Sequence, residues 1–133
     1  MACSLQALVL GPQVVWSATT TALNHPLSPP LESSRFDKIR PTLELRGATA
    51  NVQVKLAWRW SNDGISWGSW TTGGTAATSD GITHPAASPN DWIDPNTDNT
   101  SRKQFFQLGI ECDGLNSTTI NELGLVTLRI EFL

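Results

Sequence analysis

The sequence predicts an all-β protein, an antiparallel β-sandwich with an extended N-terminal segment and one long loop. Wherever the apolar pattern is regular it has a period of two, and no stretch places apolar residues at helical spacing over three turns. The 133 residues are enough for one domain with its own core, and charged residues make up only 16% of them. We therefore expect a single domain, with the sandwich in residues 36–133 and an arm or edge strands in residues 1–35.

The clearest predicted strand covers residues 52–60. Its apolar face consists of Val52, Val54, Leu56, Trp58 and Trp60. Alternation of this kind is typical of an antiparallel strand with one face against a core, so we expect Trp58 and Trp60 to fill the core. The next four residues, Ser-Asn-Asp-Gly at 61–64, favour a tight hairpin turn, and residues 65–72 are then expected to return antiparallel.

The other elements of the predicted sandwich follow from the same pattern. Residues 36–51 are interpreted as the preceding hairpin partner, with Pro41 marking an edge or a bulge. Residues 73–101 are too long for an ordinary connection, which indicates a functional or interface loop. Two strands at residues 103–112 and 123–133 are expected to close the domain.

The first 35 residues differ in character from the rest. They contain short candidate strands at residues 5–10 and 13–20, followed by a proline-rich stretch that includes Pro29 and Pro30. Proline cannot donate a ladder hydrogen bond. The segment is therefore expected either to supply edge strands of the same sandwich or to add to a neighbouring subunit's sheet.

Catalytic and metal-binding patterns are weak in this sequence. His25 and His84 each precede a proline, which favours extended loops over the fixed geometry of a general base. Asp91, Asp94 and Asp98 offer oxygen ligands of the kind that Ca²⁺ takes, but their spacing fits no EF-hand, and Asx turns explain them as well. We expect no catalytic residues, no enzymatic activity and no cofactor.

Six tryptophans and no tyrosine make the aromatic composition unusual. Exposed tryptophans can stack on sugar rings or anchor a protein interface. We take as candidate interface or ligand contacts the three tryptophans outside the core strand together with a histidine and two prolines, namely Trp67, Trp70, Trp92, His84, Pro29 and Pro30.

Charge and hydropathy bear on partners and location. The net charge is −3 and the nine basic residues are scattered, so nucleic acid is not an expected partner. No apolar run approaches the roughly 18 residues that cross a bilayer, and no signal peptide is recognisable, so we expect no membrane contact and a protein retained in a cytosol. Cys3 and Cys112 are expected to be free thiols.

Residues 56–67, LAWRWSNDGISW, and the closing residues 126–132, VTLRIEF, resemble the hairpin and final strand of discoidin-like jelly rolls. Similar hairpins occur in phage virion proteins, and the small, weakly charged domain with its arm and long loop looks like one. The resemblance implies a non-enzymatic capsid decoration or tail accessory protein. Such a protein would assemble in the host cytoplasm, form a homo-oligomer, dock on a capsid or tail protein and reside in the virion.

Two alternatives remain open from the sequence. The first is a carbohydrate-binding β-sandwich module that uses exposed tryptophans, above all Trp67 and Trp70. The second is a cytosolic interaction domain of another kind. They make different demands on the tryptophans, because a sugar platform needs open ring faces and a structural role does not.

Overall fold

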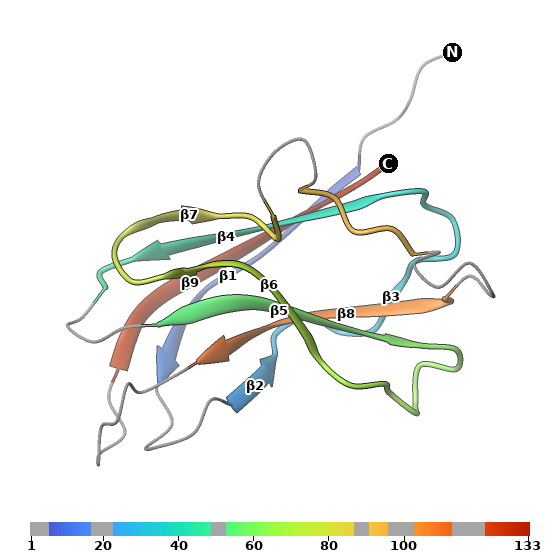
Figure 1. Cartoon of the computed structure of the whole chain (residues 1–133), viewed down its shortest axis with the longest axis horizontal. Helices are drawn as coiled ribbons and strands as arrows, with labels where there is room; N and C mark the ends of the chain where they lie inside the picture. The colour runs from blue at the N-terminus through green and yellow to red at the C-terminus, as the bar shows by residue number, and fades with distance from the viewer. Residues whose placement is uncertain (1–5, 17–22, 49–52, 87–90, 96–102, 113–121) are drawn as a thin grey trace.

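The fold is all-β and consists of two antiparallel sheets packed face to face (Figure 1), which confirms the predicted β-sandwich. The computed structural model describes residues 6–16, 23–48, 53–86, 91–95, 103–112 and 122–133. No helix in these residues is long and apolar enough to cross a membrane.

Each sheet joins strands that are distant in the sequence. In spatial order, the first sheet contains β1 (Gln6–Trp16), β9 (Glu122–Phe132), β4 (Ile39–Arg46) and β7 (Gly81–Thr83). The second contains β2 (Leu23–Pro26), β8 (Phe105–Cys112), β5 (Val54–Ser61) and β6 (Thr71–Ala77), with β3 (Leu31–Glu32) also paired to β8.

The core lies between the inner faces of the two sheets, as the alternation predicted. Its largest fully buried side chains include Phe106, Ile39, Leu43, Leu56, Leu108, Leu128 and Ile130. Trp58 is buried with these residues, and Trp60 packs against them while remaining partly exposed. Both tryptophans therefore lie on the core side of β5, as expected.

The predicted pairing of residues 36–51 with the strand that follows is wrong. β4 pairs with β9 over its whole length, from Ile39 opposite Phe132 to Arg46 opposite Leu125, and β5 belongs to the other sheet. Local alternation shows that a strand has a buried face but not which sheet it joins. Pro41 falls in a gap on the side of β4 that faces β7. The bridge at Ile39 lies before this gap and the pairing with β7 begins after it, at Leu43, so the missing N–H of Pro41 breaks no hydrogen bond between strands.

The predicted return strand and long loop also need correction. The return strand is β6, which begins at Thr71, while residues 62–70 form turns and irregular structure. Residues 73–101 are not one loop, because they include the rest of β6, all of β7 and a bridge from Ile93 to Ile39. The glycines of β6 weaken the strand pattern in the sequence, and the structure explains the one at position 74. A Cβ on Gly74 would collide with the His84 carbonyl, because β6 passes close to the end of β7 there.

The N-terminal segment pairs with strands of its own chain. β1 lies beside β9, and β2 and β3 both lie beside β8. Of the two expected arrangements, the described residues show the one in which this segment adds strands to its own sandwich. Of the two candidate strands at residues 5–10 and 13–20, the described parts form one strand, β1, with a register shift between Leu10 and Gln13, and residues 5 and 17–20 lie outside the described residues.

Candidate functional site

The most elaborate side-chain cluster lies on the outer face of the second sheet and contains two of the candidate tryptophans. The guanidinium carbon of Arg59 lies 4.9 Å from the centre of the Trp67 ring and 4.5 Å from that of Trp70. Both distances are within the range of cation–π attraction. Residues 62–70 turn back over this face of the sheet. Trp67 and Trp70 are therefore half-buried against it.

Hydrogen bonds hold the cluster to the sheet. Arg59 Nε donates to Gln107 Oε1 at 2.8 Å, and Gln107 Nε2 donates to the Ser28 carbonyl at 3.0 Å. Since Arg59 and Gln107 are opposite each other on β5 and β8, the arginine can reach both the amide and the two rings. The guanidinium is thereby fixed in position, and each ring has one face occupied by a side chain of the same protein.

Two small residues on the outer face of the second sheet are also buried. Ala57 is fully buried, and its cross-strand partner Gly109 is buried as well. A Cβ on Gly109 would lie 3.0 Å from the Trp70 ring and would collide with the His25 carbonyl. The outer face of this sheet is therefore partly covered, and a small residue on β8 is required beneath Trp70.

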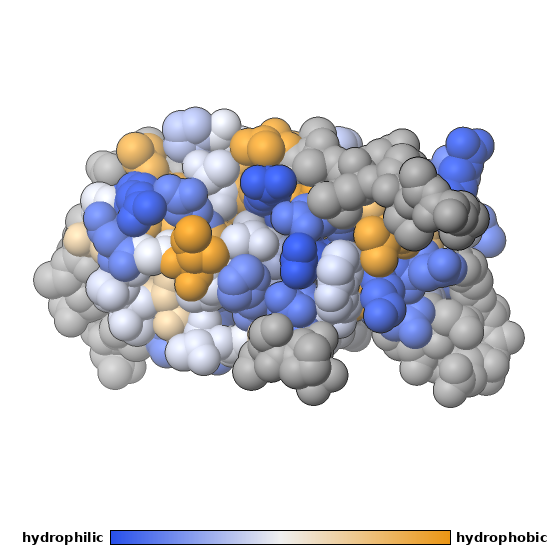
Figure 2. All heavy atoms as spheres, turned by 90° about the horizontal axis from the view of Figure 1, so that it is seen from above, coloured by the Kyte–Doolittle hydropathy of each residue, from blue (hydrophilic) through white to orange (hydrophobic). Residues whose placement is uncertain are grey.

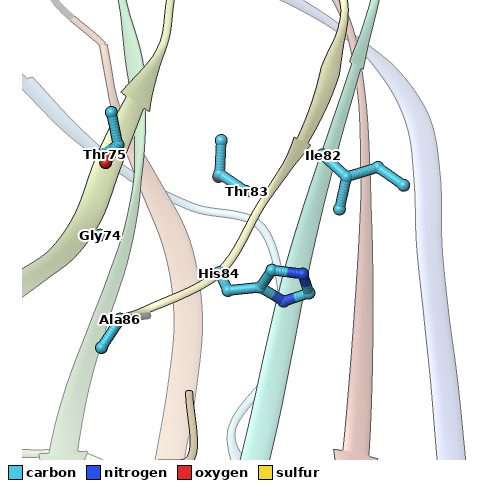
Figure 3. A pocket seen from close by; sticks show the side chains of 6 residues that line it. All are labelled: Gly74, Thr75, Ile82, Thr83, His84 and Ala86. Carbon is cyan, nitrogen blue, oxygen red and sulfur yellow. The ribbon is translucent and has the colours of Figure 1, made fainter. Parts of the chain in front are cut away.

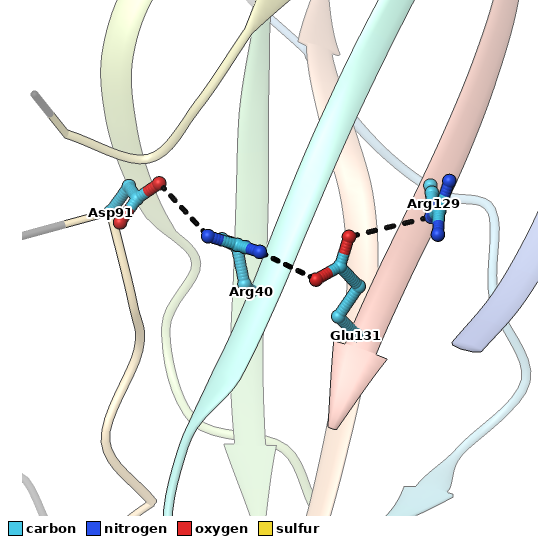
Figure 4. A network of polar contacts seen from close by, with 4 residues as sticks. All are labelled: Arg40, Asp91, Arg129 and Glu131. Carbon is cyan, nitrogen blue, oxygen red and sulfur yellow. Dashed lines mark hydrogen bonds and ion pairs between the residues drawn. The ribbon is translucent and has the colours of Figure 1, made fainter. Parts of the chain in front are cut away.

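Trp92 has a similar role on the other sheet. The Arg40 guanidinium carbon lies 4.5 Å from the centre of the Trp92 ring. Figure 4 shows the polar chain in which this arginine takes part: Asp91 lies 3.7 Å from Arg40, and Arg40 Nη2 donates to Glu131 Oε2 at 2.7 Å. The bond to Glu131 and the nearby Asp91 charge raise the pKa of Arg40. Together these contacts fasten residues 91–95 to β4.

The calcium candidates are not gathered within the described residues. Asp91 is buried and faces Arg40, whereas Asp94 is exposed, and Asp98 lies outside the described residues. In the part of the chain that the structure describes, no three His, Cys, Asp or Glu side chains lie where they could hold one metal ion.

Pro29 and Pro30 are exposed and lie at the interruption between β2 and β3. Ser28, just before them, is buried, and its Oγ accepts a hydrogen bond from Leu108 N at 2.9 Å. Its own N–H donates to the Leu108 carbonyl, also at 2.9 Å. Ser28 thus hydrogen-bonds to β8 just before the two prolines, whose backbone nitrogens have no hydrogen to donate. Nothing in the residues around this serine predicts that it is buried.

His84 lies beside an open cavity of about 250 Å³ between β6 and β7. Gly74, Thr75, Ile82, Thr83 and Ala86 also line it. In Figure 3, Thr75 and Thr83 lie on opposite sides of the gap, and the imidazole of His84 points away from Thr75. His84 is exposed, and no described carboxylate or cysteine among the lining residues would make it part of a catalytic pair.

The candidate contact residues therefore do not form one site. Trp67 and Trp70 share one cluster, while Trp92, His84 and the two prolines lie elsewhere. Arg59 and Arg40, the partners of these rings, were not among the predicted contact residues. No family model, curated protein or solved structure matches the chain.

Proposed function

We propose that the chain is a non-enzymatic structural protein of a virus particle, of the type that decorates a phage capsid or accompanies a tail. It acts through symmetric contacts with its own copies and through docking on a capsid or tail protein. The observation that supports this proposal is the edge of the first sheet formed by β1.

β1 offers an uncharged edge for pairing. It is the terminal strand of its sheet, with β9 as its one neighbour among the described strands. None of the eleven residues Gln6–Trp16 is charged. Edge strands of proteins that stay monomeric commonly carry charges, above all lysine, that discourage pairing with another chain. The absence of charge on β1 is consistent with an edge that meets another protein.

Exposed apolar side chains border this edge. Val9 is 60% exposed and Leu125 is 40% exposed, and register places both on the outer face of the first sheet, Val9 opposite Arg129 and Leu125 opposite Arg46. On the side seen in Figure 2, apolar side chains form separate patches among hydrophilic ones instead of one continuous apolar surface. Such a surface fits several modest contacts in a symmetric assembly better than one large obligate interface.

The occupant that we propose for the β1 edge is a second copy of the chain. Residues 6–10 of two β1 strands, which precede Pro12 and the register shift, would run antiparallel across a two-fold axis and bring no like charges together, since the strand carries none. The contact would join two four-stranded sheets into one.

The carbohydrate-module alternative has less support at Trp67 and Trp70. A sugar platform needs open aromatic faces, and Arg59 occupies one face of both Trp67 and Trp70. Assembly needs no such opening.

Sedimentation-velocity analytical ultracentrifugation of the full chain tests the self-association. The wild type is expected as a symmetric oligomer, and Val9→Lys is expected to shift it toward monomer, because the substitution places a charge beside each paired strand. Ile65→Lys is the matched control, since Ile65 is 83% exposed and lies on the loop after β5. A wild type that remains monomeric at micromolar concentrations, or equal dissociation by both variants, contradicts the proposed contact.

Cryo-EM of the chain co-expressed with the genes that flank its own tests the virion assignment. The expected result is a repeated subunit on a shell or a tube. Particles that form without the chain on them, together with a monomeric purified protein, would rule the proposal out.

A further inference from the structure

A second open cavity, of about 350 Å³, lies at the end of the sandwich where β5 runs into its loop and the segment leading to β8 begins. Its lining includes Trp60, Asn62, Ser66, Ser69 and Lys103. The volume is at the lower end of the range for small-molecule sites, which suits a ligand about as large as one sugar ring. None of these residues belongs to the Arg59 cluster on the outer face.

Trp60 gives the cavity an aromatic wall that is held in place. Its ring centre lies 5.0 Å from that of Phe106 at an angle of 56°, a tilted arrangement favourable for aromatic pairs. The indole is partly exposed and lines the cavity. Because Phe106 is fully buried in the core, the position of Trp60 does not depend on a ligand.

The polar rim is also ordered in advance by its own hydrogen bonds. Asp63 Oδ1 accepts from the backbone N–H groups of Ile65 and Ser66, each at 2.8 Å, and Ser61 Oγ accepts from Gly64 N at 2.9 Å. A turn fixed in this way loses little conformational freedom when a ligand binds.

The rim carries groups that match sugar hydroxyls. Asn62, Ser66 and Ser69 are exposed, and their amide or hydroxyl groups both donate and accept hydrogen bonds. Lys103, just before β8, also lines the cavity. One aromatic face with a few convergent polar groups is the composition of a site that orients a small polar ligand.

We propose that this cavity binds one uncharged pyranose ring of a glycan. The apolar C–H face of the sugar packs on Trp60, and its hydroxyls bond to Asn62 and Ser69. The proposal goes beyond the structural role above and rests on a different surface, because the β1 edge contributes no residue to the cavity.

NMR titration of the ¹⁵N-labelled full chain tests the proposal. The probes are methyl β-D-glucopyranoside, methyl β-D-galactopyranoside and N-acetylglucosamine, each added to millimolar concentration. At least one probe is expected to cause saturable amide shifts confined to residues 60–69 and Lys103. Asn62→Ala and Ser69→Ala are each expected to weaken that binding about three- to tenfold, the loss of one hydrogen bond.

Two control variants make the result specific. Thr72→Ala changes an exposed hydroxyl on β6 outside the cavity and should leave the affinity unchanged. Ile82→Ala, at a 56% exposed position on β7 that lies outside this cavity, should also leave it unchanged. The amide spectrum of each variant reports whether it is folded.

Three outcomes would overturn the proposal: no saturable shift with any probe, shifts centred on Trp67 and Trp70, or equal affinity in wild type, Asn62→Ala and Ser69→Ala. The oligomeric state measured by analytical ultracentrifugation is independent of these results, so failure of the sugar site and failure of the assembly role are distinguishable.

Discussion

The guanidinium of Arg59 lies 4.5 Å from the centre of the Trp70 ring and also stacks on Trp67, so one arginine on β5 holds the loop that follows its own strand. Arg59→Lys keeps the charge but loses the planar stacking and the bond geometry to Gln107. We expect Arg59→Lys and Arg59→Ala to lower the free energy of unfolding by about 1 kcal/mol. We also expect altered tryptophan emission.

Urea denaturation followed by fluorescence measures both effects of the Arg59 variants. Lys55→Ala, on the same face of β5, is the control and should change neither. Unchanged stability and emission in both Arg59 variants would show that the stacking contributes nothing in solution.

Gly109 is expected to tolerate no side chain. Gly109→Ala places a Cβ against the His25 carbonyl and the Trp70 ring, so β2 or the tryptophan has to move. Overpacking of this kind costs about 1–3 kcal/mol, and thermal unfolding should show a lower Tm. Gly68→Ala is the matched control, because its Cβ would meet only the Trp60 carbonyl, at 3.6 Å. If both variants melt alike, the packing described for Trp70 is wrong.

Arg40 is expected to hold residues 91–95 on the first sheet. Arg40→Met removes the contacts to Glu131 and Asp91 and leaves the buried Asp91 without its cation. We expect a loss of about 1–2 kcal/mol and faster hydrogen exchange at the Ile39 and Ile93 amides, which bond across the bridge.

Arg46→Met is the matched control for Arg40→Met. It removes a more exposed ion pair, with Glu44, from the same strand, and pairs of that kind contribute at most about 1 kcal/mol. Equal exchange rates at Ile93 in the two variants would contradict the role assigned to Arg40.

Asp63 makes the stability of the turn depend on pH. Hydrogen bonds from the Ile65 and Ser66 amides lower the pKa of its carboxyl in the folded state. A carboxyl with a depressed pKa stabilises the fold above its unfolded pKa of about 3.9, and this contribution is lost as pH falls through the folded value. Wild type should therefore exceed Asp63→Ala in stability at pH 7, with the difference shrinking below about pH 4.

Urea denaturation between pH 2 and pH 7 measures the Asp63 effect. Asn62→Ala alters the neighbouring turn residue without a titrating group, so its difference from wild type should not vary with pH in the same way. A pH-independent difference for Asp63→Ala would contradict the charge-based explanation.

Cys112 is expected to be unreactive in the native protein. The side chain is fully buried, and desolvation raises the pKa of its thiol to about 12. Since the thiolate is the reactive form, the reactive fraction at pH 8 falls on the order of a thousandfold relative to a thiol with an ordinary pKa. In a Cys3→Ser background, a thiol reagent should label Cys112 only after urea unfolds the chain. Rapid labelling of the native protein would show that the core opens there.

Alternation along the chain was sufficient to predict the inner faces of β5, β8 and β9. A residue pair such as Leu128 and Ile130 must share a face in any strand, because successive side chains point to opposite sides. The same rule places Trp58 and Trp60 correctly. It could not find β6 and β7, because strands this short or rich in glycine carry too few side chains to show a period.

For the candidate site, the sequence by itself determined which aromatic residues lie outside the core strand. That distinction depends only on the alternation of apolar residues and on the turn residues that end the strand, which are local features. Only the tertiary structure decided what they touch. Arg59 contacts Trp67 and Trp70 because residues 62–70 turn back over the sheet, and β4 pairs with β9 residues that are 79 to 93 positions away in the sequence. Such contacts depend on how whole strands are arranged in two layers, and local pattern carries no information about that arrangement.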